Sequence, residues 1–226
     1  MLRGEGFITR AVQWFGGPGQ PQVPCGVAVE GVVAEVDALR DACDRVVVVG
    51  TSFGAELGLL LAAYDSRVAA VAAFAPSAVV WAGVADGKQR SHWTWRGCDV
   101  PFARLDENWQ PDEDPPAYSE WYRLSWSRAG NDAVIPVERI AGEVLLVAGG
   151  DDRVWPSLAF AEAIRARRGG LPTTVVTHPT AGHRAILPGE RPATGGQRMA
   201  RGGDPVADSA LGAAAWPHLL RLLRQA

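Results

Sequence analysis

Residues 44–63 read DRVVVVGTSFGAELGLLLAA, in which four valines are followed by a glycine-rich turn and then by an apolar, helix-forming segment. A continuous run of β-branched residues is typical of a parallel strand that is covered on both faces. The stretch therefore predicts a strand at 46–49, a helix from residue 55, and a sharp turn at residues 50–54 between them.

The turn itself reads Gly50-Thr51-Ser52-Phe53-Gly54, which is a Gly-x-Ser-x-Gly pattern. Between a strand and a helix, this pattern is the nucleophile elbow of α/β-hydrolases. We expect glycine at both ends because a Cβ at either place would collide with the neighbouring strand and helix. The strained turn would lift the Ser52 hydroxyl over the positive end of the helix. The alternative is a glycine-rich turn without chemistry.

The size and composition of the chain indicate one globular domain that spans residues 1–226. The chain is long enough for a real core, and 47% hydrophobic with 21% charged residues is ordinary for a soluble protein. A net charge of −3 gives no attraction to nucleic acid or to a membrane surface. We therefore expect a small-molecule substrate, and neither a nucleic-acid nor a membrane partner.

Three cysteines, at positions 25, 43 and 98, make an odd number with no metal-binding spacing. Reduced thiols in the cytoplasm are the simplest account of them, and we expect no metal or other cofactor. The N-terminal residues lack the apolar region of a signal peptide. The sequence contains no run of about eighteen apolar residues, which a membrane-spanning helix would need.

Strand and helix patterns alternate along most of the chain. Strands are predicted at 7–15, 46–49, 68–74, 144–148 and 173–177, and helices at 27–42, 156–167 and 208–224. Such alternation predicts an α/β fold, of the α/β-hydrolase type, with a mainly parallel sheet, right-handed crossovers and flanking helices.

Residues 76–136 interrupt this alternation, because they show no clear strand or helix period. They contain six of the nine tryptophans, and a loop of this length is usually functional. We predict a lid-like insertion that covers the substrate, with Trp81, Trp93, Trp95 and Trp155 as substrate-binding residues. The alternative is that the tryptophans only pack the insertion onto the sheet. A second polar loop, at 189–205, is expected to be a mobile surface segment without assigned chemistry.

The acid of a catalytic triad in this fold follows the serine in the chain. Asp151 and Asp152 both follow the predicted strand at 144–148. A Gly-x-x-Asp-x-x-x-Pro spacing from Gly149 to Pro156 favours Asp152, whereas turn or cap formation is the commoner use of an aspartate such as Asp151.

The base should follow the last strand, where His178 and His183 compete. His178 lies at the strand end, and His183 lies on a loop long enough to bring its imidazole back to Ser52. We therefore predict that His183 accepts the Ser52 proton and that Asp152 orients His183. The backbone N–H of Phe53 would donate to an oxyanion. His92 and His218 are interpreted as non-catalytic.

Five segments carry a family resemblance, and together they cover nearly the whole chain. They are residues 6–16, the turn at 50–54, Ile135 to Arg139, Asp151 to Trp155, and Gly182-His183 with residues 214–217. In their order they resemble the C-terminal domain of acyl-CoA thioesterases and bile acid-CoA:amino acid N-acyltransferases, a branch near the dienelactone hydrolases. The resemblance implies a triad of Ser52, Asp152 and His183. The acyltransferase members have a cysteine nucleophile, so Ser52 favours the thioesterase type.

The chain departs from that family at its start. The resemblance implies a strand and a glycine-rich loop upstream of Phe7, and the loop would supply a second oxyanion donor. We expect an N-terminally truncated sheet, and the loss of one such donor typically costs ~100–1,000-fold in rate. We also expect a companion chain that supplies the missing strands, or a homo-oligomer, to cover the exposed sheet edge. Two explanations remain: a late start at an internal methionine, or a truncated protein whose site does something other than hydrolysis.

Three functions compete at this point. The first is hydrolysis or transfer of an acyl ester or thioester through Ser52. The second is a non-hydrolytic enzyme on the same scaffold, such as a ring-forming cyclase of specialised metabolism that works with a partner chain. The third is a non-catalytic subunit that scaffolds a partner, which the intact triad disfavours.

Overall fold

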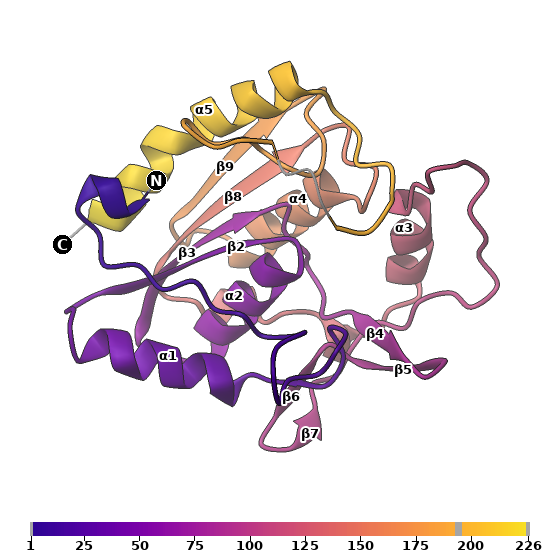
Figure 1. The fold of residues 1–226 in the computed structure, drawn as a ribbon, viewed down its shortest axis with the longest axis horizontal. Coiled ribbons are helices and arrows are strands. Elements are labelled where there is room, and N and C mark those ends of the chain that lie inside the picture. Colours follow the sequence, from indigo (N-terminus) through magenta and orange to yellow (C-terminus); the bar gives the residue numbers. More distant parts are fainter. Residues whose placement is uncertain (1, 193–195, 225–226) are drawn as a thin grey trace.

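The computed structural model describes residues 2–192 and 196–224. Its centre is a parallel sheet whose strands lie in the order β2-β3-β8-β9 (Figure 1). The strands are β2 (Val46–Thr51), β3 (Val68–Phe74), β8 (Glu143–Gly149) and β9 (Thr173–His178). The prediction of an α/β fold with a parallel sheet is confirmed, including four of its five strands. Among the described residues, no helix combines the length and the apolar character needed to cross a bilayer.

Helices cover both faces of this sheet (Figure 1). They are α1 (Glu30–Arg40), α2 (Phe53–Tyr64), α4 (Ser157–Arg168) and α5 (Pro205–Arg224). Alternate residues of β3 point to opposite faces: Val71 and Ala73 join the core formed with α1, α2 and α4, while Ala70 and Ala72 join the core under α5. Burial on both faces explains why the central strands are continuously apolar.

The segment at 7–15 is not a strand, so that prediction was wrong. A short helix, η1 (Leu2–Glu5), precedes it, and residues 7–14 are irregular. A strand needs a hydrogen-bonded neighbour, and none of the described residues bonds the backbone of 7–14 to β2. As a result β2 ends the sheet, and the Val49 side chain is 39% exposed.

The first helix is shorter than predicted, because Val27 and Ala28 form a strand instead. This strand, β1 (Val27–Ala28), pairs in parallel with β6 (Trp93–Trp95). The helix α1 therefore begins at Glu30.

The insertion at 76–136 contains regular structure that the sequence analysis missed. Two hairpins connect β4 (Ala82–Ala85) to β5 (Lys88–Ser91), and β6 to β7 (Cys98–Asp99). Their turns are Asp86-Gly87 and Arg96-Gly97, and all four residues have positive φ. Consecutive positive φ values are typical of the type I′ turns that hairpins favour. The remaining elements are α3 (Ser119–Ser127), η2 (Asn131–Ala133) and, just beyond, η3 (Val137–Arg139).

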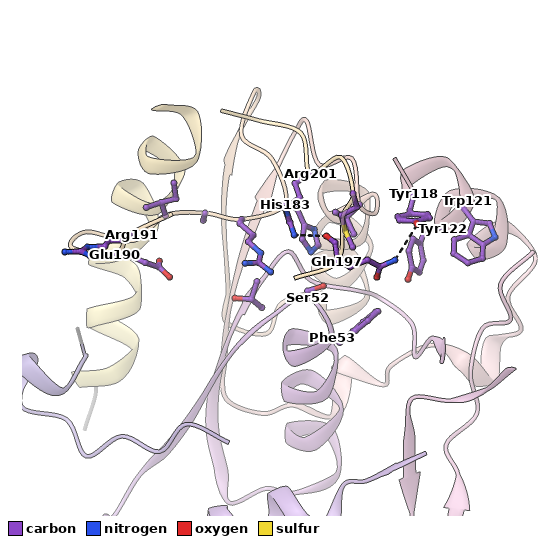
Figure 2. A pocket seen from close by; sticks show the side chains of 16 residues that line it. Ser52, Phe53, Tyr118, Trp121, Tyr122, His183, Glu190, Arg191, Gln197 and Arg201 are labelled. Atoms are coloured by element: carbon purple, nitrogen blue, oxygen red, sulfur yellow. Dashed lines mark hydrogen bonds between the residues drawn. The ribbon is translucent and has the colours of Figure 1, made fainter. Parts of the chain in front are cut away.

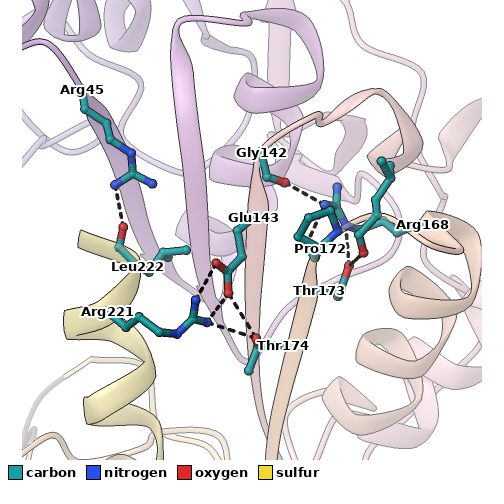
Figure 3. A network of polar contacts seen from close by, with 10 residues as sticks. Arg45, Gly142, Glu143, Arg168, Pro172, Thr173, Thr174, Arg221 and Leu222 are labelled. Atoms are coloured by element: carbon teal, nitrogen blue, oxygen red, sulfur yellow. Dashed lines mark hydrogen bonds and ion pairs between the residues drawn. The ribbon is translucent and has the colours of Figure 1, made fainter. Parts of the chain in front are cut away.

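Arginine side chains fasten the amino ends of β8 and β9 (Figure 3). Arg168 is 2% exposed, and its guanidinium donates to four backbone carbonyls and the Thr173 hydroxyl. Burial lowers the pKa of Arg168, since all these acceptors are uncharged. Nearby, Arg221 of α5 pairs with Glu143. This end of the sheet is therefore closed, and the opposite, carboxyl end is where α/β sheets form their sites.

Candidate active site

Ser52 lies at the turn from β2 into α2, with φ 59° and ψ −124°. Positive φ at a residue other than glycine is strained, as the sequence predicted for this turn. Gly50 is required, because a Cβ there would lie 2.1 Å from the carbonyl oxygen of Gly54. The same expectation was wrong for Gly54, where an added Cβ would meet nothing within 4 Å. Gly54 faces an open groove beside β2.

The turn leaves the first backbone donor of α2 available. The amide nitrogens of Ala55 and Glu56 donate to the Ser52 carbonyl, at 2.9 and 3.0 Å. No described residue accepts the Phe53 N–H. An orphan N–H at the positive end of a helix suits a developing oxyanion.

Asp152 and His183 form a buried hydrogen-bonded pair at the ends of β8 and β9. The His183 Nδ1 atom lies 2.8 Å from Oδ2 and 3.0 Å from Oδ1 of Asp152. Asp152 also accepts the N–H groups of Val154 and Trp155 at Oδ1, which fixes the carboxylate. Asp151 instead accepts the Gly203 N–H at 2.8 Å. This is the turn role that the sequence analysis considered for Asp151.

The loop that carries His183 is anchored to the start of α5. The Gly182 N–H donates to Asp208 at 2.7 Å, and the His183 N–H donates to the Arg201 carbonyl at 2.9 Å. Burial, opposed by the bond from Gly182, raises the pKa of Asp208. The other candidate base, His178, is half-buried, and its ring lies 3.5 Å from the Thr180 hydroxyl.

Ser52 and His183 line one cavity of about 550 Å³ (Figure 2). One wall is aromatic, and it comes from the start of α3: Tyr118, Trp121 and Tyr122. The other wall comes from the chain after His183 and is largely polar and charged. It contains Arg184, Glu190, Arg191, Gln197 and Arg201. In Figure 2 the aromatic group and the pair Glu190–Arg191 lie on opposite sides of Ser52.

The four tryptophans predicted to bind substrate do not line this cavity. Trp81, Trp93 and Trp155 are fully buried, and their indole N–H groups donate within the core to Ser77, Glu56 and the Ala75 carbonyl, respectively. Trp95 stacks on Tyr64, with ring centroids 6.0 Å apart. Trp81, Trp93 and Trp95 pack the insertion against α2 and α4, which agrees with the alternative that such tryptophans only hold the insertion in place. Trp155 follows β8, outside the insertion, and packs against Tyr122 of α3.

The sequence analysis missed the residues that do form the walls. The spacing of Tyr118, Trp121 and Tyr122 is i, i+3, i+4, and this places three aromatic rings on one side of a helix. That signal was available in the sequence. The sequence gives no such signal for the cavity-lining residues between 190 and 201, because the 189–205 loop has no periodic pattern. Residues 193–195 of that loop lie outside the described residues.

A second buried pair lies below the cavity, one turn into α2. Glu56 is fully buried, and its Oε1 atom accepts the indole N–H of Trp93 at 2.6 Å and the backbone N–H of Trp81 at 3.2 Å. His92 Nδ1 lies 3.2 Å from the same oxygen. The His92 ring packs against Phe53, with centroids 4.2 Å apart. Glu56 thus ties the insertion to α2, the helix that follows Ser52.

The described residues contain no group of three or more His, Cys, Asp or Glu side chains that could hold a metal ion. Cys25, Cys43 and Cys98 are free thiols. The groups at the cavity are therefore a hydroxyl, an imidazole–carboxylate pair, an orphan N–H and several guanidinium groups. Together they can activate a nucleophile and stabilise negative charge.

Most of the chain matches a known protein family. Residues 40–226 match a family model described as BAAT / acyl-CoA thioester hydrolase C terminal. No curated protein matches the chain. The matched region begins just before β2 and includes the elbow, both loops of the Asp152–His183 pair and both walls of the cavity.

Proposed function

Because the chain belongs to the BAAT / acyl-CoA thioester hydrolase C-terminal family, we propose that it cleaves an acyl ester or thioester with Ser52 as the nucleophile. Membership indicates an enzyme of the thioesterase or acyltransferase type. The observation that supports Ser52 as the nucleophile is the buried Asp152–His183 pair, whose imidazole lines the same cavity as Ser52.

The proposed mechanism has two steps. His183 accepts the Ser52 proton while Oγ attacks the acyl carbonyl, and Asp152 holds the imidazole at Nδ1. The Phe53 N–H donates to the oxygen that becomes negative. The alcohol or thiol leaves with the proton from His183, and an acyl-serine remains. A water molecule, deprotonated by His183, then attacks this acyl group, and the carboxylic acid leaves as His183 returns the proton to Ser52 Oγ. With an acceptor other than water, the same intermediate would transfer its acyl group.

A covalent probe tests this assignment. Purified protein is treated with a fluorophosphonate and digested, and the modified peptide is identified by mass spectrometry. We expect labelling at Ser52, loss of labelling in Ser52→Ala, and parallel loss of ester or thioester hydrolysis. Modification of another residue, or hydrolysis that survives Ser52→Ala, would exclude Ser52 as the nucleophile.

The aromatic wall favours a second candidate, a ring-forming cyclase of specialised metabolism. Three aromatic rings beside an acid–base pair suit a shaped, apolar substrate. A cyclase would not need a serine nucleophile. Product analysis distinguishes the two, because a cyclase would convert its substrate without consuming water and would retain activity in Ser52→Ala.

We also propose that a separate polypeptide adds an extended strand beside β2. The outer edge of β2 has no backbone partner among the described residues. A groove of about 210 Å³ lies between β2, α1 and residues 10–14, lined by apolar groups that include Val47, Val49 and Trp14. An open parallel edge lacks hydrogen-bond partners and apolar cover, and an alternating apolar strand would provide both. A second copy of the chain is the other possible source.

Light scattering and kinetics test the added strand. We expect the chain alone to be oligomeric, insoluble or inactive. A soluble monomer that turns over a simple ester at ordinary rates, about 1 per second or more, would contradict the proposal.

We place the working complex in the cytoplasm, because all three cysteines are free thiols. Cell fractionation tests that placement.

A further inference from the structure

The aromatic wall of the cavity carries three polar side-chain groups, and two of them are already engaged. The Tyr118 hydroxyl accepts a hydrogen bond from Nε2 of Gln197 at 3.5 Å. The Trp121 indole N–H donates to the Asp106 carbonyl at 2.7 Å. The Tyr122 hydroxyl has no hydrogen-bond partner among the described residues, although Tyr122 lines the cavity. Tyr122 therefore differs from its neighbours on the wall in offering a free donor.

The Tyr122 ring is held in a fixed place. The residue is 7% exposed, and its ring meets the fully buried rings of Trp81 and Trp155 edge to face, with centroids 4.7 and 5.6 Å apart. In Figure 2 the ring lies below Tyr118, and its hydroxyl end points away from Tyr118 toward the side where Phe53 lies. Because the ring is clamped on two sides, the hydroxyl cannot swing out to bulk solvent. Its partner must therefore enter the cavity, as water or as a group of the substrate.

The surroundings of Tyr122 favour an uncharged partner. Burial, and after it the charge of Glu56, raise the pKa of Tyr122 above its usual range, so the hydroxyl keeps its proton and can donate it in a hydrogen bond. Glu56 is fully buried, and its Oε2 atom has no partner among the described residues. A carboxylate or phosphate beside Tyr122 would be repelled by this buried charge. The acceptor that suits Tyr122 is therefore a neutral oxygen, such as a ketone, an ether or a hydroxyl.

We propose that the Tyr122 hydroxyl is a specificity-determining donor, which binds a neutral oxygen in the apolar part of the substrate. The inference rests on the proposed function, because that function makes the cavity of Ser52 and His183 the substrate site. It narrows the substrate to an ester or thioester whose hydrocarbon part carries a ketone, ether or hydroxyl oxygen. Such a site disfavours an all-hydrocarbon analogue, because the analogue would leave the buried hydroxyl unpaired.

Two substrate scans test this preference. The first compares p-nitrophenyl octanoate with octanoates that carry a ketone at each successive carbon of the acyl chain. The second compares octyl acetate with acetates whose octyl chain carries the ketone in the same way. We expect at least one ketone-bearing ester to have a kcat/KM about 5- to 100-fold above that of its parent, as for the pairing of a buried donor. Equal kcat/KM values at every position in both scans would overturn the proposal.

Removal of the hydroxyl alone assigns the preference to Tyr122. Tyr122→Phe should abolish it by lowering kcat/KM for the ketone-bearing ester, while kcat/KM for the parent stays the same or rises. The urea midpoint should also stay the same or rise, since the free protein loses no hydrogen bond. Tyr64→Phe is the matched control, because Tyr64 is 44% exposed, stacks on Trp95 and does not line the cavity. A preference that survives Tyr122→Phe, or one that Tyr64→Phe removes equally, would contradict the assignment.

A second comparison removes a hydroxyl from the same wall. Tyr118→Phe should retain most of the preference, because the Tyr118 hydroxyl already has Gln197 as its partner. A loss of preference in Tyr118→Phe as large as that in Tyr122→Phe would show that the whole wall, and not the unpaired donor, selects the substrate.

A binding measurement separates this inference from the proposed function. Octanamide and the ketone-bearing octanamides, which are neutral and contain no ester, are titrated calorimetrically into Ser52→Ala, with and without Tyr122→Phe. We expect one ketone-bearing amide to bind more tightly than octanamide, and the difference to vanish in the double variant. If fluorophosphonate fails to label Ser52 but this difference appears, the hydrolase proposal fails and the role of Tyr122 stands. If Ser52 is labelled and neither kinetics nor binding shows a preference that depends on Tyr122, the inference fails alone.

Discussion

Two histidine–carboxylate pairs lie close to the turn that carries Ser52, and they are built alike. In each, a carboxylate oxygen meets the imidazole Nδ1, at 2.8 Å for Asp152–His183 and at 3.2 Å for Glu56–His92. Both pairs are almost inaccessible to solvent: the exposed fractions are 9% and 6% in the first pair, and 0% and 1% in the second. Burial and pairing alone therefore do not decide which of the two pairs would act in the proposed mechanism.

The pairs differ in how the carboxylate is used. Both oxygens of Asp152 approach the imidazole, and His183 faces the cavity. Glu56 receives all its donors at Oε1, Oε2 has no partner, and His92 packs behind Phe53 without lining the cavity. A ring at the cavity wall can exchange protons with a substrate, whereas a ring sealed in the core can only hold elements together. Access to the cavity thus separates the two roles.

The largest expected effect is on the Asp152–His183 pair. Asp152→Asn should lower kcat by about 10,000-fold without unfolding the protein, because an amide favours the wrong imidazole tautomer. Ester or thioester kinetics and circular dichroism measure this. Asp151→Asn is the matched control: its amide oxygen can still accept the Gly203 N–H, so activity should stay within a few-fold. The reverse pattern would make Asp151 the orienting acid.

Substitutions in the Glu56–His92 pair should lower the free energy of unfolding more than they lower activity. Glu56→Gln keeps an acceptor for Trp93 but puts an amide donor where Oε2 has no partner. A buried unsatisfied donor costs about 1–3 kcal/mol. We expect the free energy of unfolding, measured with urea, to fall by that amount. The kcat should change by less than about tenfold. Glu56→Ala should cost more, because it leaves three donors without an acceptor. A loss of kcat as large as that of Asp152→Asn, at unchanged stability, would give Glu56 a catalytic role.

The sequence predicts the parts of the fold that depend on local pattern. Valine runs and apolar periodicity located β2, β3, β8 and β9 to within one or two residues. The segment at 7–15 has strand-forming residues, but strand formation also requires a neighbour, which no local pattern supplies. The hairpins of the insertion were predictable in part, since Asp86-Gly87 is a strong hairpin signal.

The site was predictable where chemistry follows chain order. Ser52, Asp152 and His183 follow three strand ends, and the structure brings the last two into contact and puts Ser52 and His183 on one cavity. The tryptophan predictions failed because composition does not tell which way a side chain points. Trp81 and Trp93 turn inward to Ser77 and Glu56, and neither contact is visible in a sequence pattern. The arginines of the polar wall reach the cavity only through tertiary folding.

The smallest expected effect concerns the carboxyl groups around the Asp152–His183 pair. Burial, and after it the charges of Asp204, Asp151 and Asp152, raise the pKa of Asp208. In contrast, backbone hydrogen bonds from Ala207 and Val206 lower the pKa of Asp204. The contributions of Asp208 and Asp204 to stability should therefore depend on pH in opposite directions.

For Asp208, the native state binds the proton more tightly than the unfolded state does. Its contribution to stability is present at acid pH and is lost as pH rises through the folded pKa. Asp208→Asn keeps an acceptor for the Gly182 N–H without the charge, so at neutral pH it should match or exceed wild-type stability, by less than about 1 kcal/mol because solvent screens a half-exposed group. Asp204→Asn is the control with the opposite sign, since Asp204 stabilises above its unfolded pKa and that stability is lost as pH falls. Urea midpoints from about pH 2.5 to about pH 8 measure both, because the stability from Asp204 is lost only below its unfolded pKa of about 3.9. If Asp208→Asn became steadily less stable than the wild type as pH rose from 4 to 8, the charge of Asp208 would stabilise the fold. The neighbouring carboxylates would then stabilise the loop that carries His183 instead of destabilising it.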